Sequence, residues 1–256
     1  VAPQGVYVCS DETLMEAKEL ASREKTFCHY HVSETRHEVY EYQKLKGKRP
    51  VEHLAEIGFL SKGDIGAHGA WLTINEVRAL AKAGVSVAHC PTSNMKLASG
   101  GVAPVPEMLA EGVQVCLGTD GCSSNNGLDM FLEMKFASLM HKHNRWDASV
   151  ISAQKALDMA TIDAAKCIGA VKDLGSLETG KKADLVIIDC SLPSMVPTRE
   201  NNAVANLVYA GPSHAVRDTM VDGRFVLKDR RIQTIDEKMS LKKAEAVADQ
   251  LMEKSR

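Results

Sequence analysis

Short apolar segments alternate with amphipathic helical segments through the first two thirds of this chain. Between the apolar segments, apolar residues recur every three or four positions, as they do on one face of a helix. Strands that alternate with helices form parallel sheets, because a helix carries the chain back to the same end of the sheet. The sequence therefore predicts an α/β fold. The strands that we predict span residues 27–32, 64–68, 85–89 and 113–119.

Signals for helix starts fall between these strands. Thr73 and Glu76 form a capping-box pattern, which predicts a helix over residues 74–83. Pro50 is placed to open another helix at its first position. The remaining helices that we predict span residues 14–21, 51–57, 128–142 and 150–168.

The pattern changes after about residue 173. An apolar segment at 184–188 predicts a strand, and Asp222-Gly223 predicts the turn of a hairpin, because Asp-Gly fits a two-residue turn. From Ser240 onward apolar residues return at helical spacing, and we expect this last helix to dock on the rest of the protein. We therefore predict an α/β domain over residues 1–174 and a β-rich module with a C-terminal helix over residues 175–256.

The charge balance excludes some classes of partner. The 256 residues include 31 Lys and Arg against 33 Asp and Glu, for a net charge of -2. This balance provides no basic field for a polyanion, so we expect neither nucleic acid nor a membrane as a partner. A small neutral or zwitterionic molecule fits better.

Cysteine usage and the chain start suggest where the protein works and what precedes it. Seven cysteines, an odd number without a C-x-x-C pair, predict reduced thiols in a cytoplasmic protein. The first residues resemble neither a signal peptide nor a transit peptide. The chain has no initiator Met and opens in what reads as the end of a strand. We therefore expect a missing N-terminal part, and exposed sheet edges that make a homo-oligomer plausible.

Ionisable residues gather where the predicted strands end. His68, His89 and Asp120 lie at the ends of three strands, and His31 lies beside the end of the fourth. In α/β barrels the catalytic groups collect at the carboxyl ends of the strands. A single strand-end His is often structural, and Asp120 in Gly-Thr-Asp-Gly can shape a turn. The four together favour a functional site.

The segment from Cys28 to Glu34 offers further candidates. His29 and His31 alternate onto the same face of the strand, and an H-x-H pair can bind one metal, but the spacing does not choose between them. Glu34 lies where the strand turns into a loop, either near whatever His31 binds or as a solvated acid. We predict the other histidines to be surface or structural residues: His37, His53, His141, His143 and His214.

An ordered series of motifs runs along the chain. The series covers nearly the whole chain and is more specific than any one of its members. The motifs are His31-Val-Ser-Glu-Thr35, His68-Gly-Ala-Trp-Leu72, Ala88-His-Cys-Pro-Thr-Ser-Asn-Met-Lys-Leu-Ala-Ser-Gly100, Leu117-Gly-Thr-Asp-Gly121, Ser124-Asn-Asn-Gly-Leu-Asp-Met130 and Gly175-Ser-Leu-Glu-Thr-Gly-Lys-Lys-Ala-Asp-Leu-Val-Ile-Ile188. Together they resemble the amidohydrolase superfamily, in particular the methylthioadenosine, S-adenosylhomocysteine and 5'-deoxyadenosine deaminases.

The resemblance implies a fold and a metal site. The fold is the C-terminal half of a metal-dependent (β/α)8 TIM barrel followed by a small β-sandwich module. The metal is one zinc, or iron, bound here by His31 and Asp120, with His29 as a neighbour. The resemblance also places Glu34 on the substrate ring and His68 on the attacking water, and gives His89 a supporting place near the substrate.

The implied reaction is hydrolytic deamination of a 6-aminopurine nucleoside. A bound metal lowers the pKa of water from 15.7 toward roughly 7, and Asp120 can accept its proton. Glu34, when protonated, would donate to the ring nitrogen next to C6, and His68 would stabilise the developing oxyanion. Ammonia leaves and a 6-oxopurine remains.

Two departures from the family keep alternatives open. The first-strand H-x-H of the family is absent, so only two of four expected protein ligands are present. Gln4 stands where the family commonly has a substrate-contacting His, in Pro3-Gln-Gly-Val-Tyr7. The alternatives are another amidohydrolase, such as a guanine or s-triazine deaminase or chlorohydrolase, and a non-catalytic fragment.

Overall fold

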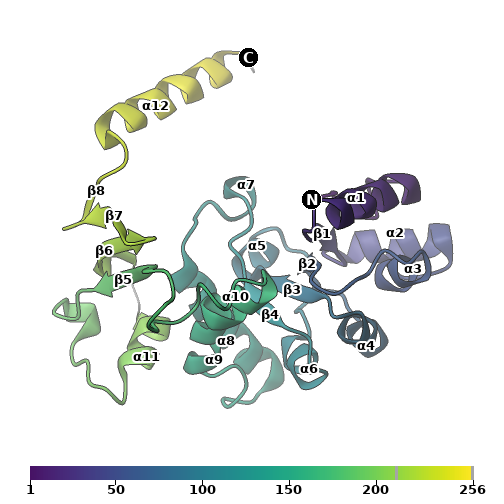
Figure 1. Cartoon of the computed structure of the whole chain (residues 1–256), viewed down its shortest axis with the longest axis horizontal. Coiled ribbons are helices and arrows are strands. Elements are labelled where there is room, and N and C mark those ends of the chain that lie inside the picture. The colour runs from purple at the N-terminus through teal and green to yellow at the C-terminus, as the bar shows by residue number, and fades with distance from the viewer. Residues whose placement is uncertain (211–212, 255–256) are drawn as a thin grey trace.

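A parallel sheet forms the centre of the protein. The computed structural model describes residues 1–210 and 213–254. Four neighbouring strands lie in chain order (Figure 1). Their parallel register brings the carboxyl ends, with His31, His68 and His89, to one edge of the sheet. This arrangement confirms the predicted α/β fold, although each strand is shorter than predicted. The strands are β1 (His29–Val32), β2 (Ile65–His68), β3 (Ser86–His89) and β4 (Val115–Leu117).

The two faces of this sheet differ. Tyr30, Val32, Val87 and Val115 point to one side and are buried in the main hydrophobic core, together with side chains from the helices. Such burial stabilises the fold by about 25 cal/mol for each Å² of apolar surface removed from water. The residues that alternate with them face the opposite side, and several of these line cavities. One face is therefore packed in the main core. The other carries a small buried cluster around Cys167 and otherwise borders cavities, and we call it the open face.

The helices between the strands follow the predicted pattern with a few differences. Thr73 forms the predicted capping box with Glu76. The predicted helix over residues 150–168 is two helices, because Thr161 departs from helical geometry. The helices are α1 (Asp11–Arg23), α2 (Arg36–Lys46), α3 (Pro50–Glu56), α4 (Ile74–Ala83), α5 (Pro91–Lys96), α6 (Val105–Ala110), α7 (Cys122–Asn125), α8 (Met130–Arg145), α9 (Ala153–Ala160) and α10 (Ile162–Cys167).

The N-terminal segment lies along the free edge of β1. The carbonyl of Val1 accepts from the amide of His29, and the carbonyl of Gln4 accepts from the amide of His31, both at 2.9 Å. Gly5 bridges His31 in a parallel sense, and a Cβ on Gly5 would come within 2.8 Å of the carbonyl oxygen of His31. Glycine at this position allows the close approach that places Gln4 beside His31.

An antiparallel sheet follows the α/β region. It contains β5 (Leu185–Ile188), β6 (Val216–Val221), β7 (Arg224–Lys228) and β8 (Arg231–Ile232). The predicted hairpin is present, and Asp222 and Gly223 both have positive φ, as its turn requires. The described residues of the predicted module, 175–210 and 213–254, form one sheet, whereas a sandwich has two. Residues 211–212 and 255–256 of that predicted module lie outside the described part.

Short helical segments join β5 to β6. They are η1 (Pro193–Met195), α11 (Ala203–Ala205), η2 (Asn206–Ala210) and η3 (Ser213–Ala215).

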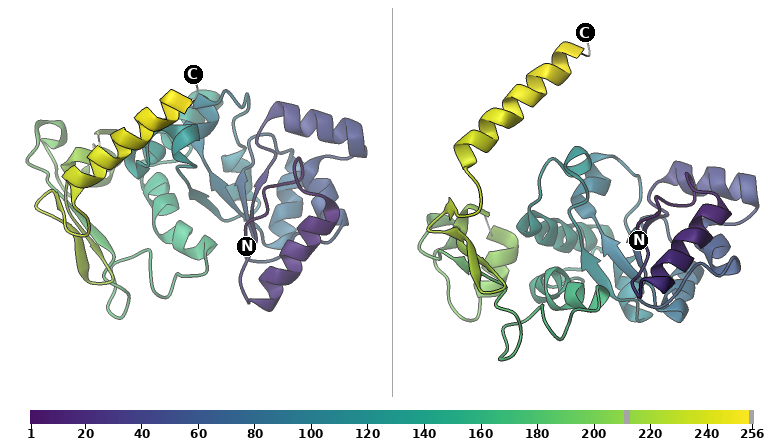
Figure 2. Two further views of the ribbon diagram at one scale, coloured as in Figure 1. Left: turned by 90° about the horizontal axis from the view of Figure 1, so that it is seen from above. Right: turned by 45° about the horizontal axis from the view of Figure 1, so that its top comes forward.

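The last helix, α12 (Glu237–Lys254), contradicts the prediction that it docks. It projects away from both sheets (Figures 1 and 2), and none of its described residues is buried. Leu241, Val247 and Leu251 are 54–62% exposed. The amphipathic pattern correctly predicted a helix, but its described apolar residues remain unburied.

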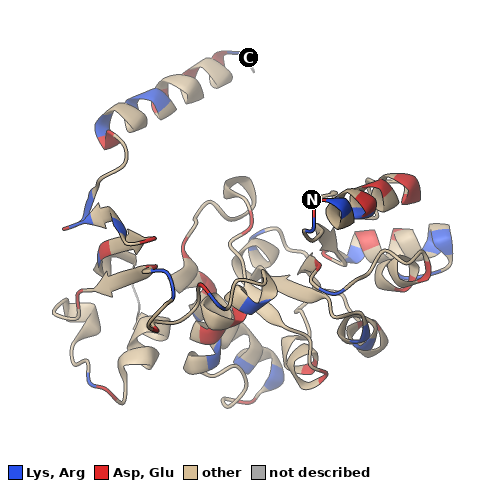
Figure 3. Cartoon of the chain, in the orientation of Figure 1, with Lys and Arg blue, Asp and Glu red and all other residues tan. Residues whose placement is uncertain are grey.

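Charges of both signs are spread over the same helices (Figure 3), in keeping with a net charge of -2. All seven cysteines are free thiols, as predicted. Among the described residues, the helices are too short or too polar to cross a membrane.

Candidate functional site

Three predicted site residues meet at the carboxyl ends of β1 and β2. Nδ1 of His31 lies 2.8 Å from Nε2 of His68. Oε2 of Glu34 lies 3.7 Å from that His31 nitrogen and 3.6 Å from that His68 nitrogen. The rings of His31 and His68 stack, with centroids 5.0 Å apart. Parallel pairing of β1 with β2 brings these residues together from positions 37 apart in the chain.

The backbone is unusual where these strands end. Ser33, His68 and Asp120 have φ of 48°, 75° and 59°, in the left-handed region that residues other than glycine seldom adopt. Each such residue costs on the order of 1–3 kcal/mol and persists only where its surroundings hold it in place. Strain of this kind gathers at functional sites, and here it occurs at two of the predicted catalytic residues, His68 and Asp120.

Asp120 lies beside this cluster, just beyond the end of β4. Its Oδ2 accepts a 2.6 Å hydrogen bond from the hydroxyl of Ser93, and its Oδ1 accepts a 2.8 Å bond from the amide of Gly121. Burial alone raises the pKa of Asp120, but these hydrogen bonds and the nearby His68 and His31 hold the pKa below its ordinary value. The carboxylate is therefore kept ionised, as a metal ligand must be.

Burial shifts the pKa values of Glu34 and His68 in opposite directions. Burial raises the pKa of Glu34, and the negative charge of Asp120 adds to the rise, so this carboxyl holds a proton more readily than an exposed one. Burial, helped by His31, lowers the pKa of His68 to about 4, so its imidazole is neutral at pH 7. The site thus offers one carboxylate, one carboxyl with a raised pKa and one neutral imidazole.

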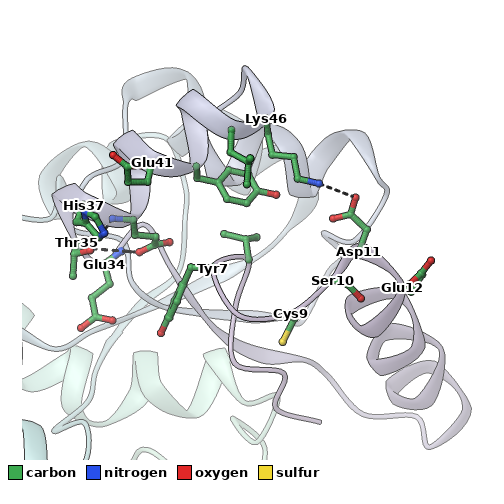
Figure 4. Close-up of a pocket in the computed structure, with 14 residues that line it drawn as sticks. Tyr7, Cys9, Ser10, Asp11, Glu12, Glu34, Thr35, His37, Glu41 and Lys46 are labelled. Atoms are coloured by element: carbon green, nitrogen blue, oxygen red, sulfur yellow. Dashed lines mark hydrogen bonds and ion pairs between the residues drawn. The ribbon is translucent and has the colours of Figure 1, made fainter.

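Two cavities adjoin these residues. A cavity of about 240 Å³ lies on the open face of the sheet and is lined by Gln4, His31 and Asp120 among others. A larger cavity, about 920 Å³, extends from Glu34 between α1 and α2 (Figure 4). Tyr7 lies in this larger cavity and accepts a 2.9 Å hydrogen bond from the side-chain amide of Gln4. Gln4 thus connects the two cavities.

His89 lies apart from the small cavity, although its neighbours Ala88 and Cys90 line it. The ring of His89 is buried against α8, with Nε2 3.3 Å from Nε2 of His141. The substrate contact assigned to His89 stays a prediction, and this packing favours the supporting role. The expectation that His141 is structural agrees with its complete burial.

The remaining histidines lie outside the cluster. His53 is buried and lies 2.9 Å from Oδ1 of Asp11. His29 is exposed on β1, and three others are exposed on helices: His37, His143 and His214.

Two residues near the site were not singled out from the sequence. Ser93 donates to Asp120, and the amide nitrogen of Asn94 lies 3.2 Å from Nδ1 of His68. Both are buried on α5, the short helix that follows β3. Their signal in the sequence was their position, because polar residues directly after a parallel strand lie at the catalytic edge.

The donor atoms of His31, Glu34 and His68 fit a metal ion. One ligand atom from each lies within 4.8 Å of the others. Imidazole nitrogen and carboxylate oxygen are ligands that zinc prefers. Asp120 is outside this group of three but borders the same small cavity as His31.

The chain is similar to known hydrolases over nearly its whole length. The model of the Amidohydrolase family matches residues 1–226. A protein named 5'-deoxyadenosine deaminase, from Methanosphaera stadtmanae, is 41% identical over 98% of this chain and 58% of its own. One named 5-methylthioadenosine/S-adenosylhomocysteine deaminase, from Thermodesulfovibrio yellowstonii, is 41% identical over 95% of this chain and 55% of its own.

A solved structure agrees in fold. The crystal structure of an adenosine deaminase from Xanthomonas campestris, with bound zinc, superposes with a TM-score of 0.94 and 34% identity, over 98% of this chain and 56% of that one. This chain therefore spans little more than half the length of the proteins that it matches.

Proposed function

We propose that this chain, which belongs to the amidohydrolase family, carries the catalytic half of a zinc-dependent hydrolase that deaminates 6-aminopurine nucleosides. The observation that supports this most is the meeting of His31, Glu34 and His68 beside Asp120 at one edge of a parallel sheet. Relatives named deaminases of 5'-deoxyadenosine, methylthioadenosine and S-adenosylhomocysteine favour an adenosine-type substrate.

Each residue has a role that its environment suits. His31 and Asp120 would hold the zinc, with iron as the alternative. A bound zinc lowers the pKa of its water from 15.7 toward about 7. With the metal bound, Asp120 would be placed to accept a proton from the water, and Glu34 would donate a proton to the ring nitrogen next to C6, which its raised pKa favours. Neutral His68 donates a hydrogen bond to the oxygen that adds to C6.

Substrate recognition rests on residues around the two cavities. Glu34 would contact the purine ring, and Gln4 lies between the small cavity and Tyr7, where it can donate and accept hydrogen bonds. The predicted supporting role of His89 would be indirect, through its neighbours Ala88 and Cys90, which line the small cavity. Because Gln4 carries no charge, we expect the protein to bind the ribose or its 5' substituent differently from relatives with a histidine there.

The domain division is also a proposal. Residues 1–174 would form the C-terminal half of a (β/α)8 barrel, and 175–256 a β-sandwich module that needs segments from outside this chain. The open face of the parallel sheet supports this division, as does the antiparallel sheet that residues 175–210 and 213–254 form. Seven free thiols favour a cytoplasmic protein, and its exposed sheet edges would permit a homo-oligomer.

The test is a metal and turnover measurement with a matched control. The chain is expressed together with its upstream coding segment, bound zinc and iron are measured, and ammonia release is followed with four nucleosides: 5'-deoxyadenosine, methylthioadenosine, S-adenosylhomocysteine and adenosine. Asp120→Asn keeps the shape but weakens the metal ligand. We expect nearly one metal per chain and turnover that disappears in the control.

Other outcomes separate the alternatives. The protein could bind metal and turn over amino-triazines, chloro-triazines or guanine, but no nucleoside. That outcome would change the proposed substrate class and leave the family assignment intact. If the protein binds no metal and turns over none of these compounds, the proposal that it is an enzyme is refuted and a non-catalytic module is favoured.

A further inference from the structure

Asn94 is a buried polar residue that presents its donor side to His68. It lies on α5, and only 6% of its surface is exposed. Its amide nitrogen lies 3.2 Å from Nδ1 of His68 and 3.4 Å from the hydroxyl of Ser99. Its amide oxygen has no hydrogen-bond partner among the described residues. A buried amide that leaves its oxygen unpaired is held in this orientation by what its nitrogen contacts.

This orientation determines where His68 carries its proton. An amide NH2 group only donates, so Nδ1 of His68 must accept. A neutral imidazole has one proton, which then resides on Nε2. That nitrogen faces the cluster, 2.8 Å from His31 and 3.6 Å from Glu34.

The contacts of the Nε2 side of the His68 ring fit the same tautomer. Nε2 of His68 faces a carboxyl oxygen of Glu34 and a ring nitrogen of His31, both of which can accept a hydrogen bond. If the side-chain amide of Asn94 were flipped, its oxygen would face Nδ1 of His68 and favour the ring proton on that nitrogen. Nε2 would then present a lone pair to these two acceptors. The contacts at both ends of the ring are therefore compatible with one tautomer, the one that the Asn94 amide selects.

Asn94 is itself held firmly enough to act in this way. Its backbone amide donates to the carbonyl of Cys90, and its carbonyl accepts from the amide of Ser99, both at 3.0 Å. The carbonyl of Ser99 accepts a 2.7 Å hydrogen bond from the indole of Trp71, which follows β2. These bonds tie α5 to the loop after His68, so the amide and the imidazole keep their mutual position.

We propose that Asn94 is a positioning residue, which fixes His68 in the tautomer with its proton on Nε2 and so directs a hydrogen-bond donor into the site. The importance of this donor rests on the proposed function, because it would stabilise negative charge on the oxygen that adds to the ring. Partners one layer behind a site commonly change activity by about 10- to 100-fold when they are replaced.

The test reads the tautomer directly and needs no catalysis. The chain is labelled with 15N at histidine, and nitrogen NMR at pH 7 assigns each ring proton; His68→Gln identifies the signals of His68 among nine histidines. In the unchanged chain we expect the proton on Nε2. Asn94→Asp replaces the donor by an acceptor of nearly the same shape, and we expect the proton to move to Nδ1. Ser99→Ala removes the other side-chain partner of Asn94 and should leave the proton on Nε2.

A proton on Nδ1 in the unchanged chain would overturn the proposal, whether or not the variants fold. So would a folded Asn94→Asp chain whose His68 proton stays on Nε2. In the longer protein, we expect Asn94→Asp to lower kcat about 10- to 100-fold with little change in KM. If no nucleoside is deaminated but the proton moves as expected, the proposed function fails and the positioning role stands.

Discussion

Acid should destabilise this protein through two histidines that face each other between β3 and α8. His89 and His141 are 1% and 0% exposed, and neither Nδ1 has a hydrogen-bond partner among the described residues. Burial, followed by the charge of Arg145, lowers the pKa of His141 from 6.5 to about 4. Burial, followed by His141 and then His68, also lowers the pKa of His89. Both rings are therefore neutral in the folded protein at pH 7.

The sign and size of the effect follow from the pKa of His141. Because its folded pKa lies below the unfolded value, the unfolded chain binds more protons between pH 6.5 and 4, and the free energy of unfolding decreases as the pH falls through this window. The difference of 6.5 - 4 = 2.5 pKa units, at about 1.4 kcal/mol per unit, corresponds to roughly 3 kcal/mol by pH 4. At pH 5.5 the loss is about 1.4 kcal/mol.

Urea unfolding measured between pH 7.5 and 5 tests this reasoning. His141→Gln keeps a polar side chain beside His89 but removes the titrating group, so its free energy of unfolding should fall less steeply with decreasing pH. His143→Gln, an exposed position on the same helix, is the matched control and should keep the slope of the unchanged chain. Equal slopes for His141→Gln and the unchanged chain would refute the argument.

Three further substitutions test other parts of the structure. Glu34→Gln should lower kcat by about 10²- to 10⁴-fold while zinc stays bound, because it removes the proposed proton donor; an unchanged kcat would exclude that role. Thr73→Ala should lower the free energy of unfolding in urea by about 1 kcal/mol through loss of the capping box of α4. Lys18→Met leaves the buried carboxylate of Asp64 without its ion-pair partner and should cost about 3–5 kcal/mol in the same measurement; a cost below 1 kcal/mol would mean that the pair contributes little.

The parts of the fold that the sequence predicted depend on local pattern. The four strands were predicted because apolar side chains follow one another there, and the capping box of α4 because Thr73 and Glu76 are neighbours on one turn. The helix α2 was missed, although Thr35 and Glu38 form a capping box of the same kind. Apolar residues recur less regularly along α2 than along the helices that were predicted, so the capping box was its only clear signal.

Contacts between distant segments were harder to predict. His89 and His141 are 52 residues apart in the chain, and nothing near either residue indicates the other. The prediction that α12 docks on the rest of the protein was wrong for a similar reason. An apolar helical face shows that a helix can pack but not what it packs against. By contrast, the approach of His31 to His68 follows from adjacent parallel strands, whose carboxyl ends must lie at one edge.

The open face of the parallel sheet connects the fold to the proposed metal site. Ile65, Ala88 and Cys116 point to this face and line a cavity of about 780 Å³ that α10 and β5 close only in part. Those three side chains are already buried, but Ile168, Leu177 and Val186 line the same cavity and are 47–75% exposed. Because apolar side chains gain free energy when they are covered, these residues favour another layer of protein. His31 lies on the same face, at the small cavity. A segment that covers this face would therefore also approach the proposed metal site. If the chain is half of a barrel, as we propose, we expect completion of the barrel and tight zinc binding to occur together.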